Sequence, residues 1–293
     1  MQISCKDLKF TFNKKSKFPT VALNGITLDI KEGETVGIIG HTGSGKSTFI
    51  QHINRLIEVD EGLLTVGKYN LSPKTRKEKK TLKKELRELR KGVGMVFQYP
   101  EYQLFAESVY ADCAFGVRQF YPEISEEQVA LKVQNALEQV GLDYFAVKDK
   151  SPFEMSGGQK RRVAIAGVIA TCPEILVLDE PLAGLDPSGK ADLMELIKDV
   201  KRTACKTVII VSHDMDEVCD NCDRVIVFSD GKVELDGTPK QVFSQAEKLK
   251  ELRMDCPVTA NVTRYLAERG IRVDNDYSVD GFVSAVVKAV KDE

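Results

Sequence analysis

The segment that most constrains this chain is a glycine-rich loop between a short apolar run and a helical pattern. The apolar run Thr35–Ile39 is typical of a buried strand, and residues 49–57 place apolar side chains at the three-to-four spacing of a helix. Between a strand and a helix, the spacing G-x-x-x-x-G-K-[ST] lets successive backbone N–H groups surround a phosphate. The sequence therefore predicts an α/β fold with a P-loop nucleotide-binding core. The loop and the threonine after it comprise Gly40, His41, Thr42, Gly43, Ser44, Gly45, Lys46, Ser47 and Thr48.

A second short apolar run, Ile175–Leu178, predicts another buried strand, and it leads directly into Asp179 and Glu180. In P-loop enzymes the loop lysine reaches the β- and γ-phosphates and the hydroxyl after it ligates Mg²⁺. These roles fit Lys46 and Ser47. Asp179 is expected to bind the same metal, and Glu180 is placed to take a proton from the attacking water. A strand that ends in two acids by chance is the less favoured interpretation behind such a loop.

Length and charge limit the classes of protein that remain. A chain of 293 residues is long enough for one large domain with an appendage. Its net charge of -2 gives no global reason to expect a nucleic-acid partner. No run approaches the roughly 18 to 20 apolar residues that span a bilayer, and the N-terminal residues do not form a signal peptide. We therefore expect a cytosolic chain that meets a membrane only through a local patch or a partner.

The seven cysteines are an odd number, which fits reduced thiols rather than a disulfide framework. Cys219 and Cys222 form a single C-x-x-C pair. A zinc or redox site would need a second pair at ligand spacing, and the sequence has none. We interpret these two residues as thiols on one helical face.

Periodicity divides the chain into regions of different structure. Alternation predicts strands at residues 3–12 and 22–30, and residues from about 101 to 165 have a helical pattern. Thr207–Val211 predicts a further strand, and residues 224–235 predict a hairpin. From about residue 240 the pattern changes to short helices, which we interpret as a separate small unit.

Residues 74–91 form a run of charge, with ten Lys or Arg against three Glu and a local net charge of +7. Leu82, Leu86 and Leu89 recur at helical spacing, which predicts an amphipathic surface helix or a helical hairpin. A solvated face is the favoured interpretation. Contact with anionic lipid headgroups is the alternative that the sign of the charge suggests.

The segment Met155–Gln159, about twenty residues before the acidic strand, narrows the class. With it the chain resembles the ATPases of ABC transporters. In that family this signature begins a helix and binds the γ-phosphate of ATP held on the opposite subunit. Small residues with free N–H groups at a helix N-terminus suit an anion. Met155 stands where the family usually has leucine, and the two side chains have similar volume.

Other positions match the same family. Gln98 resembles the Q-loop glutamine that senses Mg²⁺ and water, and His213 resembles the switch histidine that contacts the γ-phosphate. Asp186 belongs to a D-loop that crosses the dimer interface. Phe12 aligns with an aromatic residue that stacks on adenine, although a core phenylalanine is the alternative.

The resemblance thus implies a set of site residues for ATP and Mg²⁺. It implies catalytic roles for Lys46, Gln98, Glu180 and His213. It implies metal binding by Ser47, Gln98 and Asp179. The residues that it assigns to ATP are Phe12, Gly40 to Thr48, Ser156, Gly157, Gly158, Gln159 and Asp186.

Longer stretches, namely residues 97–105, 152–167 and 181–187, resemble the ATPase subunits of energy-coupling factor (ECF) transporters, which import vitamins and metal ions. The charged insertion before Gln98 is similar to that of the second of the two ATPase subunit types. The resemblance implies an ABC ATPase domain over residues 1–240. That domain has a RecA-like core, an antiparallel β subdomain and a helical subdomain at about 101–165. Residues 241–293 are then a helical unit that strengthens the ATPase dimer.

The resemblance also implies partners. These are a second ABC ATPase in a head-to-tail dimer, expected to be a heterodimer, a transmembrane coupling subunit and membrane subunits that bind substrate. The chain would lie peripherally on the cytoplasmic face of the cell membrane, with no nucleic-acid partner. Glu101, Glu107 and Asp112 fall where the family has an acidic groove for basic coupling helices. Whether they line a groove or only solvate a helix is open from the sequence.

Three other functions are possible interpretations of the same motifs. The ATPase of a conventional importer with an external binding protein shares every catalytic motif and is the main alternative. A soluble ABC protein acting on DNA or ribosomes is disfavoured by the charge balance, the single ATPase module and the lack of a heptad arm. A degenerate nucleotide-binding scaffold is disfavoured because Lys46, Asp179, Glu180 and His213 are intact.

Overall fold

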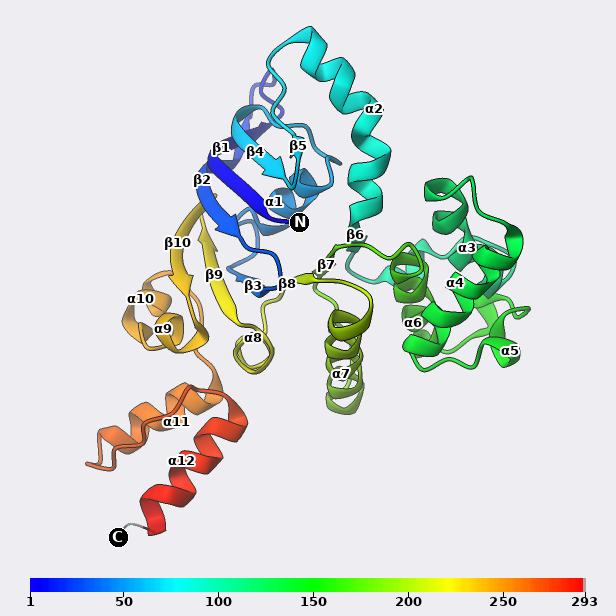
Figure 1. Cartoon of the computed structure of the whole chain (residues 1–293). Coiled ribbons are helices and arrows are strands. Elements are labelled where there is room, and N and C mark those ends of the chain that lie inside the picture. The colour runs from blue at the N-terminus through cyan, green and yellow to red at the C-terminus, as the bar shows by residue number, and fades with distance from the viewer. Residues whose placement is uncertain (292–293) are drawn as a thin grey trace.

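The computed structural model of the chain describes residues 1–291, and its centre is a twisted, mostly parallel β-sheet (Figure 1). Its strands run in the order β10-β9-β3-β8-β7-β6. All neighbouring strands are parallel except β10, which forms an antiparallel hairpin with β9. The strands are β3 (Thr35–Ile39), β6 (Val93–Val96), β7 (Ile175–Asp179), β8 (Thr207–Val211), β9 (Arg224–Ser229) and β10 (Lys232–Gly237).

A smaller antiparallel sheet, in the order β2-β1-β4-β5, packs on one face of the central sheet. It contains both N-terminal strands that the alternation predicts, with β2 beginning two residues earlier than expected. The sequence analysis did not identify β4, β5 or β6, which are short and partly apolar. The strands of this sheet are β1 (Ile3–Phe12), β2 (Thr20–Ile30), β4 (Glu61–Val66) and β5 (Tyr69–Asn70).

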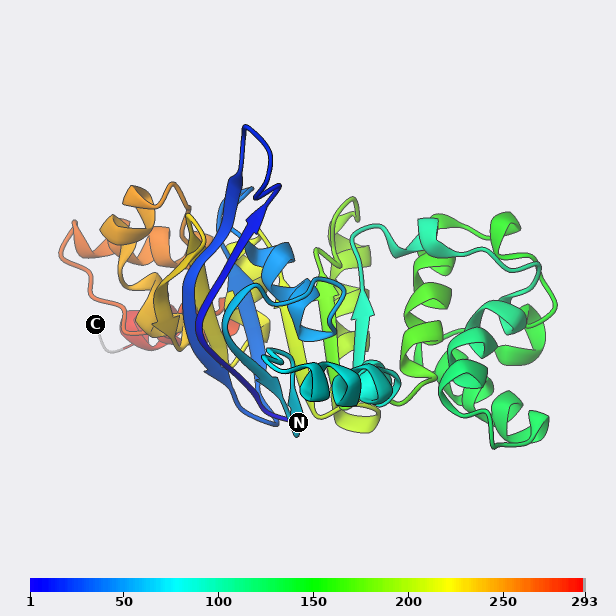
Figure 2. The same ribbon diagram turned by 90° about the horizontal axis from the view of Figure 1, so that it is seen from above.

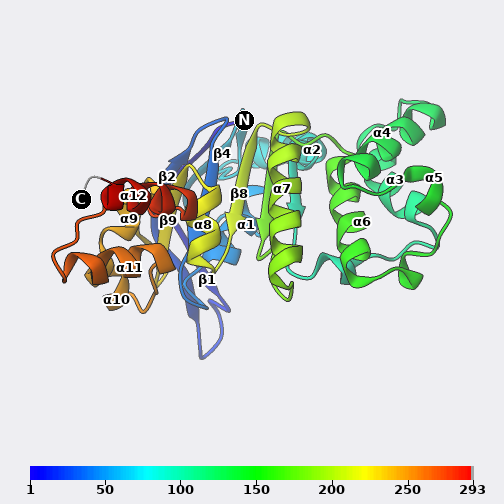
Figure 3. The ribbon, with the colours of Figure 1, turned by 90° about the horizontal axis from the view of Figure 1, so that it is seen from below.

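The core lies on both faces of the central sheet, and alternate strand residues belong to different sides. In β7, Ile175 and Val177 pack with the small sheet and helix α1. Leu176 and Leu178 pack on the opposite face with α6, α7 and α8. Figure 3 shows α7 and α8 lying along that second face. The helices are α1 (Lys46–Ile53), α6 (Gly157–Ile169), α7 (Pro187–Thr203) and α8 (Met215–Asn221).

Helix α1 ends at Ile53, so the expectation that Leu56 and Ile57 continue its apolar face is wrong. Arg55 adopts a left-handed backbone with φ of 54°. The side-chain oxygen of Asn54 accepts a hydrogen bond from the backbone N–H of Leu56 at 3.2 Å. An asparagine that bonds to nearby backbone in this way competes with the helix and ends it.

A helical subdomain projects from the β6–β7 edge of the central sheet, as Figures 1 and 2 show. Helix α6 packs on α3 and α4 and reaches back to β6, and α4 also contacts α7, so these helices join the subdomain to the core. Met155 is buried there, which agrees with its expected fit in place of leucine. The other helices of the subdomain are α3 (Val109–Phe120), α4 (Glu126–Gln139) and α5 (Tyr144–Val147).

The charged run forms one amphipathic helix, α2 (Arg76–Gly92), rather than a hairpin. It begins with a capping box in which Thr75 accepts from the Glu78 N–H and Glu78 accepts from the Thr75 N–H. Leu82 and Leu89 are buried, whereas most of the Lys and Arg side chains are exposed.

After β10 the chain forms four further helices at the end of the molecule opposite the helical subdomain (Figure 2). Phe243 and Leu249, from the first two, are buried in the core that α8 also joins. The last two lie farther out. Across residues 1–291 we find no helix long and apolar enough to cross a membrane. The four helices are α9 (Pro239–Phe243), α10 (Ala246–Glu251), α11 (Val258–Ala267) and α12 (Val279–Lys291).

Both cysteines of the C-x-x-C pair pack in the core. Cys219 lies in α8 and Cys222 caps its end, and both thiols are buried. Burial raises the pKa of Cys219 to about 12, so this thiol stays protonated. Within the described part of the chain, no cluster of His, Cys, Asp and Glu has the arrangement of a metal site.

Gly37 in β3 provides a test of how closely α8 packs on the sheet. A Cβ atom at Gly37 would lie 2.5 Å from Cγ1 of Val218 and 3.0 Å from Sγ of Cys222. We expect Gly37→Ala to lower the free energy of unfolding by about 1–3 kcal/mol, because the crowded core has to shift. Thermal unfolding measures this effect.

Gly167→Ala is the matched control. A Cβ atom there would meet only ordinary contact, 3.7 Å from Cα of Cys113, within helix α6. Alanine is the better helix former, so this variant should be neutral or more stable. Equal stability of the two variants would contradict the packing that we describe.

Candidate nucleotide-binding site

The parallel alignment of three neighbouring strands brings the candidate residues together. Ile38 of β3 and Asp179 of β7 both pair with Val211 of β8, so the three strands end at one edge of the sheet. The P-loop follows β3, Glu180 follows β7, and His213 follows β8. Carboxyl ends of parallel strands are where α/β proteins place their ligands.

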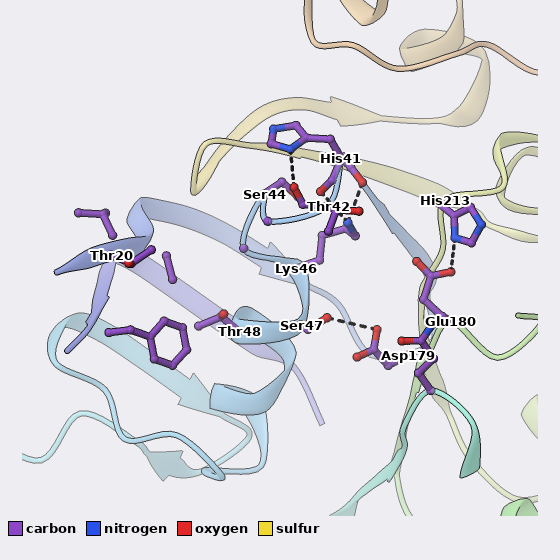
Figure 4. A pocket seen from close by; sticks show the side chains of 17 residues that line it. Thr20, His41, Thr42, Ser44, Lys46, Ser47, Thr48, Asp179, Glu180 and His213 are labelled. Atoms are coloured by element: carbon purple, nitrogen blue, oxygen red, sulfur yellow. Dashed lines mark hydrogen bonds and ion pairs between the residues drawn. The ribbon is translucent and has the colours of Figure 1, made fainter. Parts of the chain in front are cut away.

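These residues line one cavity of about 700 Å³, shown in Figure 4. Its walls include every residue predicted for catalysis and for the metal, the whole of Gly40–Thr48, and Phe12. Thr20, Val21 and Ala22 also line it, and the sequence analysis did not single them out. They sit at the start of β2, where no motif distinguishes them.

Phe12 lies at the rim of the cavity rather than in the core. Its side chain is 40% exposed, and its ring meets that of Phe10 edge to face, with centroids 4.8 Å apart. The interpretation as a core phenylalanine is therefore wrong. An exposed aromatic face at the mouth of the cavity is suited to stacking on a planar ring.

Two glycines allow the loop to adopt its shape. Gly40 has φ of 152°, and a Cβ atom there would lie 2.2 Å from the carbonyl oxygen of Phe228. Gly45 has φ of 104°, and its Cβ would lie 2.5 Å from the carbonyl oxygen of Ala22. Inside the loop, the hydroxyl of Ser44 is buried without a hydrogen-bond partner among the described residues. The cradle therefore fits an anion that supplies acceptors.

Lys46 begins helix α1 and points into the loop (Figure 4). Its Nζ donates to the carbonyl oxygens of Gly40 at 2.6 Å and His41 at 3.1 Å. Burial lowers the pKa of Lys46, although the nearby Glu180 and Asp179 carboxylates oppose this. A partly buried ammonium group held by neutral carbonyls favours the approach of a negatively charged ligand.

Ser47, at the start of α1, faces Asp179, at the end of β7. The hydroxyl of Ser47 lies 3.5 Å from Oδ1 of Asp179, and Asp179 is buried. Burial raises the pKa of the Asp179 carboxyl, and the hydrogen bond from Ser47 opposes the rise. A carboxylate and a hydroxyl oxygen beside a phosphate cradle are ligands that Mg²⁺ prefers, so the pair fits this metal.

Glu180 and His213 form a contact that motif reasoning did not predict. Nδ1 of His213 lies 2.6 Å from Oε2 of Glu180. Glu180 holds a left-handed backbone with φ of 50°, fixed by its N–H donating to the carbonyl of Val211 at 2.8 Å. Such a conformation is uncommon for a residue with a side chain and concentrates at functional sites. It directs a partly buried carboxylate into the cavity.

The signature residues lie outside this cavity. Ser156 caps α6 by accepting from the Gln159 N–H at 3.3 Å, and Gln159 accepts from the Ser156 N–H at 3.2 Å. Gly157 and Gly158 are exposed, and a Cβ atom on either would have nothing within 4 Å. Asp186 likewise caps α7, accepting from the Gly189 N–H at 3.0 Å. One copy of the chain does not bring these residues to its own P-loop.

Arg161 links the signature helix to two segments beside the cavity, and the sequence analysis did not identify it. Its guanidinium bonds twice to Glu101, at 3.2 and 3.0 Å, just after the Q-loop. It also donates to the carbonyls of Pro181 at 3.2 Å and Ala183 at 3.0 Å, just before Asp186. Its side chain is only 6% exposed.

A second, largely apolar groove of about 360 Å³ lies between the core and the helical subdomain. Phe97, Phe105 and Phe115 are among its walls. The sequence left open whether Glu101, Glu107 and Asp112 line a groove, and of the three only Asp112 lines this one. Glu101 is bound to Arg161, and Asp112 accepts from the N–H groups of residues 105 and 106 at 2.9 Å each. These carboxylates are committed to internal contacts, whereas Glu107 is free of any within the described chain.

Comparison with known proteins agrees with this geometry. The model of the ABC transporter family matches residues 23–183. This chain belongs to that family. The energy-coupling factor transporter ATP-binding protein EcfA2 of Clostridium perfringens is 45% identical over 94% of this chain and 93% of its own length. EcfA2 of Clostridioides difficile gives the same identity and the same coverage of both chains. Within the family, therefore, the chain groups with the ECF ATP-binding subunits, as the sequence resemblance predicted.

Solved structures show the same fold. CbiO1 of Clostridium perfringens, described as part of the ABC transporter complex CbiONQ, has a TM-score of 0.72 and 35% identity, covering 89% of this chain and 98% of its own. A dimeric ATP-binding cassette in a post-hydrolysis state with ADP and phosphate has a TM-score of 0.70 and 28% identity, covering 81% and 98%. The α/β fold and the ATPase class are thereby confirmed.

We expect Glu180→Gln to reduce ATP turnover by about 10²- to 10⁴-fold, the usual contribution of a positioned general base. Glutamine keeps the size of the side chain and cannot take a proton. Nucleotide binding should persist, because Lys46 and Ser47 are untouched. Phosphate release and binding of a fluorescent ATP analogue measure the two effects.

Glu195→Gln is the control for this change, since Glu195 is an exposed residue of α7 outside the cavity. It should retain normal turnover. Normal turnover in the Glu180→Gln variant would remove Glu180 from the role of base.

We expect Arg161→Met to destabilise the protein by about 3–5 kcal/mol, because it leaves Glu101 largely buried and unpaired. The double variant Arg161→Met, Glu101→Met should recover most of that loss. ATP turnover should be lower than normal in the single and in the double variant, because each loses the bonds from Arg161 to the carbonyls of Pro181 and Ala183. Chemical unfolding and ATPase assays of the double-mutant cycle test this link. Additive effects on stability would contradict a direct pair.

Proposed function

We propose that this chain binds Mg²⁺ and ATP in the P-loop cavity and hydrolyses the ATP to power an ECF transporter. The transporter imports vitamins or metal ions through membrane partner subunits. One observation carries the proposal: a buried lysine, a Ser–Asp pair and a Glu–His pair meet in a single cavity at the ends of parallel strands.

Each residue has a role that its position supports. Lys46 and the loop N–H groups hold the β- and γ-phosphates, and Ser47, Asp179 and Gln98 hold Mg²⁺, which neutralises charge on the phosphate oxygens. Glu180 takes the proton of the attacking water. His213 bonds to that carboxylate, keeps it oriented and reaches toward the γ-phosphate. Phe12 stacks on the adenine.

The signature residues serve a second ATPase. Ser156, Gly157, Gly158 and Gln159 lie exposed at the N-terminus of the thirteen-residue helix α6, where backbone N–H groups favour an anion. In a head-to-tail dimer they close the cavity of the partner, and Asp186 lies at the same interface. We expect the partner to be a different chain of the same family, so that the dimer is a heterodimer.

The tail supports the same dimer. Val279, Val283 and Val287 are exposed at four-residue spacing on α12, and Val262 and Tyr265 are exposed on α11. Apolar side chains repeated along one helix face are typical of a surface that a partner covers. We assign residues 241–293 to dimerisation.

The apolar groove receives the transmembrane coupling subunit. It lies between the core and the helical subdomain, so a helix seated in it contacts both. Closure of the ATPase dimer would then move that helix and the membrane partner with it. The chain would therefore lie on the cytoplasmic face of the membrane without spanning it.

We expect Phe105→Ala to weaken assembly with the membrane partner at least tenfold while ATP binding persists. Phe105 lines the groove, is 61% exposed and stacks edge to face on Phe115. Phe145→Ala is a matched control, since Phe145 is 72% exposed, stacks on Tyr144 and lies outside the groove. Recovery of the membrane partner with each tagged variant measures assembly. Equal recovery would place the partner elsewhere.

Affinity purification of the tagged chain from detergent-solubilised membranes, with mass spectrometry, tests the transporter type. We expect a second ABC ATPase, one coupling membrane protein and small hydrophobic substrate-binding subunits. Paired permeases with an extracellular binding protein would favour the main alternative, a conventional importer ATPase. Recovery only with ribosomes or DNA would overturn the transporter function.

A further inference from the structure

Helix α2 carries positive charge that the rest of the chain does not neutralise. Among the basic side chains of residues 74–91, only Lys91 forms an ion pair with a residue in the described part of the chain. Its Nζ lies 3.9 Å from Oε2 of Glu88. Glu78 is bound to the backbone N–H groups that begin the helix. Seven exposed basic side chains have neither a hydrogen bond nor an ion pair to described residues: Lys74, Arg76, Lys77, Lys79, Lys80, Lys83 and Lys84.

The charge lies mainly on one side of the helix. Leu82 and Leu89 turn inward and are buried. At 100° per residue, Lys77, Lys80 and Lys84 then lie on the opposite, outward side. Long side chains of this kind can extend several ångströms from the helix surface.

The end of α2 is anchored to the fold beside the apolar groove. Arg90 donates to the carbonyls of Asn54 and Arg55 at 3.3 and 3.1 Å, and Arg87 donates to the carbonyl of Phe120 at 3.1 Å. Arg90 also lines the groove, as does Val93 just after the helix. In Figure 1, α2 extends upward from β6 beside the small sheet, and its first turn lies at the top of the molecule. The outward lysines therefore lie on a helix whose C-terminal end borders the groove.

Positive and negative charge are distributed unevenly along the chain. The whole chain carries -2 and residues 74–91 carry +7, so the remaining residues carry -9. An extended anionic surface would repel most of the protein and attract this helix. A polynucleotide offers the same sign of charge, but a groove for a membrane subunit at the foot of α2 favours a lipid surface.

We propose that the outward face of α2 binds anionic lipid headgroups of the membrane next to the subunit that fills the groove. The orientation toward the membrane rests on the proposed function, whereas the attraction itself depends only on the charge of α2. A lysine close to an anionic leaflet adds about a fivefold factor to binding. Several such lysines hold the ATPase against the membrane while its dimer opens and closes.

Co-sedimentation with lipid vesicles tests the proposal on the full-length chain. We expect binding to phosphatidylcholine vesicles that contain phosphatidylglycerol, and none to phosphatidylcholine alone. Binding should weaken strongly between 0.1 M and 1 M salt, where the Debye length falls from about 10 Å to about 3 Å. Replacing four lysines by glutamine, which keeps helix propensity, should weaken binding at least tenfold. The four are Lys77, Lys80, Lys83 and Lys84.

A control variant makes the same change in net charge elsewhere. It replaces four exposed lysines that have no side-chain bond to described residues by glutamine: Lys15, Lys31, Lys198 and Lys250. This variant should bind vesicles nearly as well as the unmodified chain. Equal loss in both variants would mean that net charge alone matters and would overturn a site on α2. Failure of the unmodified chain to bind anionic vesicles at low salt would overturn it as well.

Two further measurements separate this proposal from the function on which its orientation rests. The four-lysine variant should keep normal ATP turnover, and Glu180→Gln should keep normal vesicle binding. A single-stranded RNA oligonucleotide is the competing ligand. If the four substitutions abolished RNA binding but left vesicle binding intact, α2 would serve a nucleic acid and the proposal would be wrong.

Discussion

The alignment of β3, β8 and β7 is the constraint on which the site depends. Three short, fully buried strands end at one level because Ile38 and Asp179 both pair with Val211. A different functional group follows each strand. The phosphate-binding loop follows β3, the acidic pair lies at the end of β7, and His213 follows β8. A shift of one residue in any of them would turn its side chains to the other face and separate the groups.

The site is assembled at an energetic cost that ligands would offset. Lys46 and Asp179 are both buried enough for their pKa values to move toward the neutral forms. Ser44 has a buried hydroxyl without a partner in the described chain, and Glu180 holds an uncommon backbone. Together these features leave donors and charges positioned for the triphosphate and metal that we propose, which is how preorganised sites stabilise charge.

Sequence alone predicted the parts of this site that follow from local motifs. The P-loop and the acidic strand could be placed because their chemistry demands fixed spacing, and β3, β7 and β8 followed from their apolar runs. Strands β4, β5 and β6 were missed because they are short and weakly patterned. The Glu180–His213 contact and the role of Arg161 depend on tertiary packing between segments far apart in the chain. Whether Glu101 and Asp112 line a groove could not be decided from the sequence, because their bonds to Arg161 and to the N–H groups of residues 105 and 106 form only in the folded chain.

In the proposed dimer the site is divided between two chains, because the P-loop cavity of one faces the signature helix of the other. A cryo-electron microscopy structure of the membrane complex purified with the Glu180→Gln variant, in Mg²⁺ and ATP, tests it most directly. We predict ATP in the cavity of this chain, with its γ-phosphate between Lys46 and the signature helix of the facing ATPase, while Ser156 of this chain faces the partner's nucleotide. An ATP enclosed by this chain alone, or a signature helix turned away from any nucleotide, would contradict this division of the site.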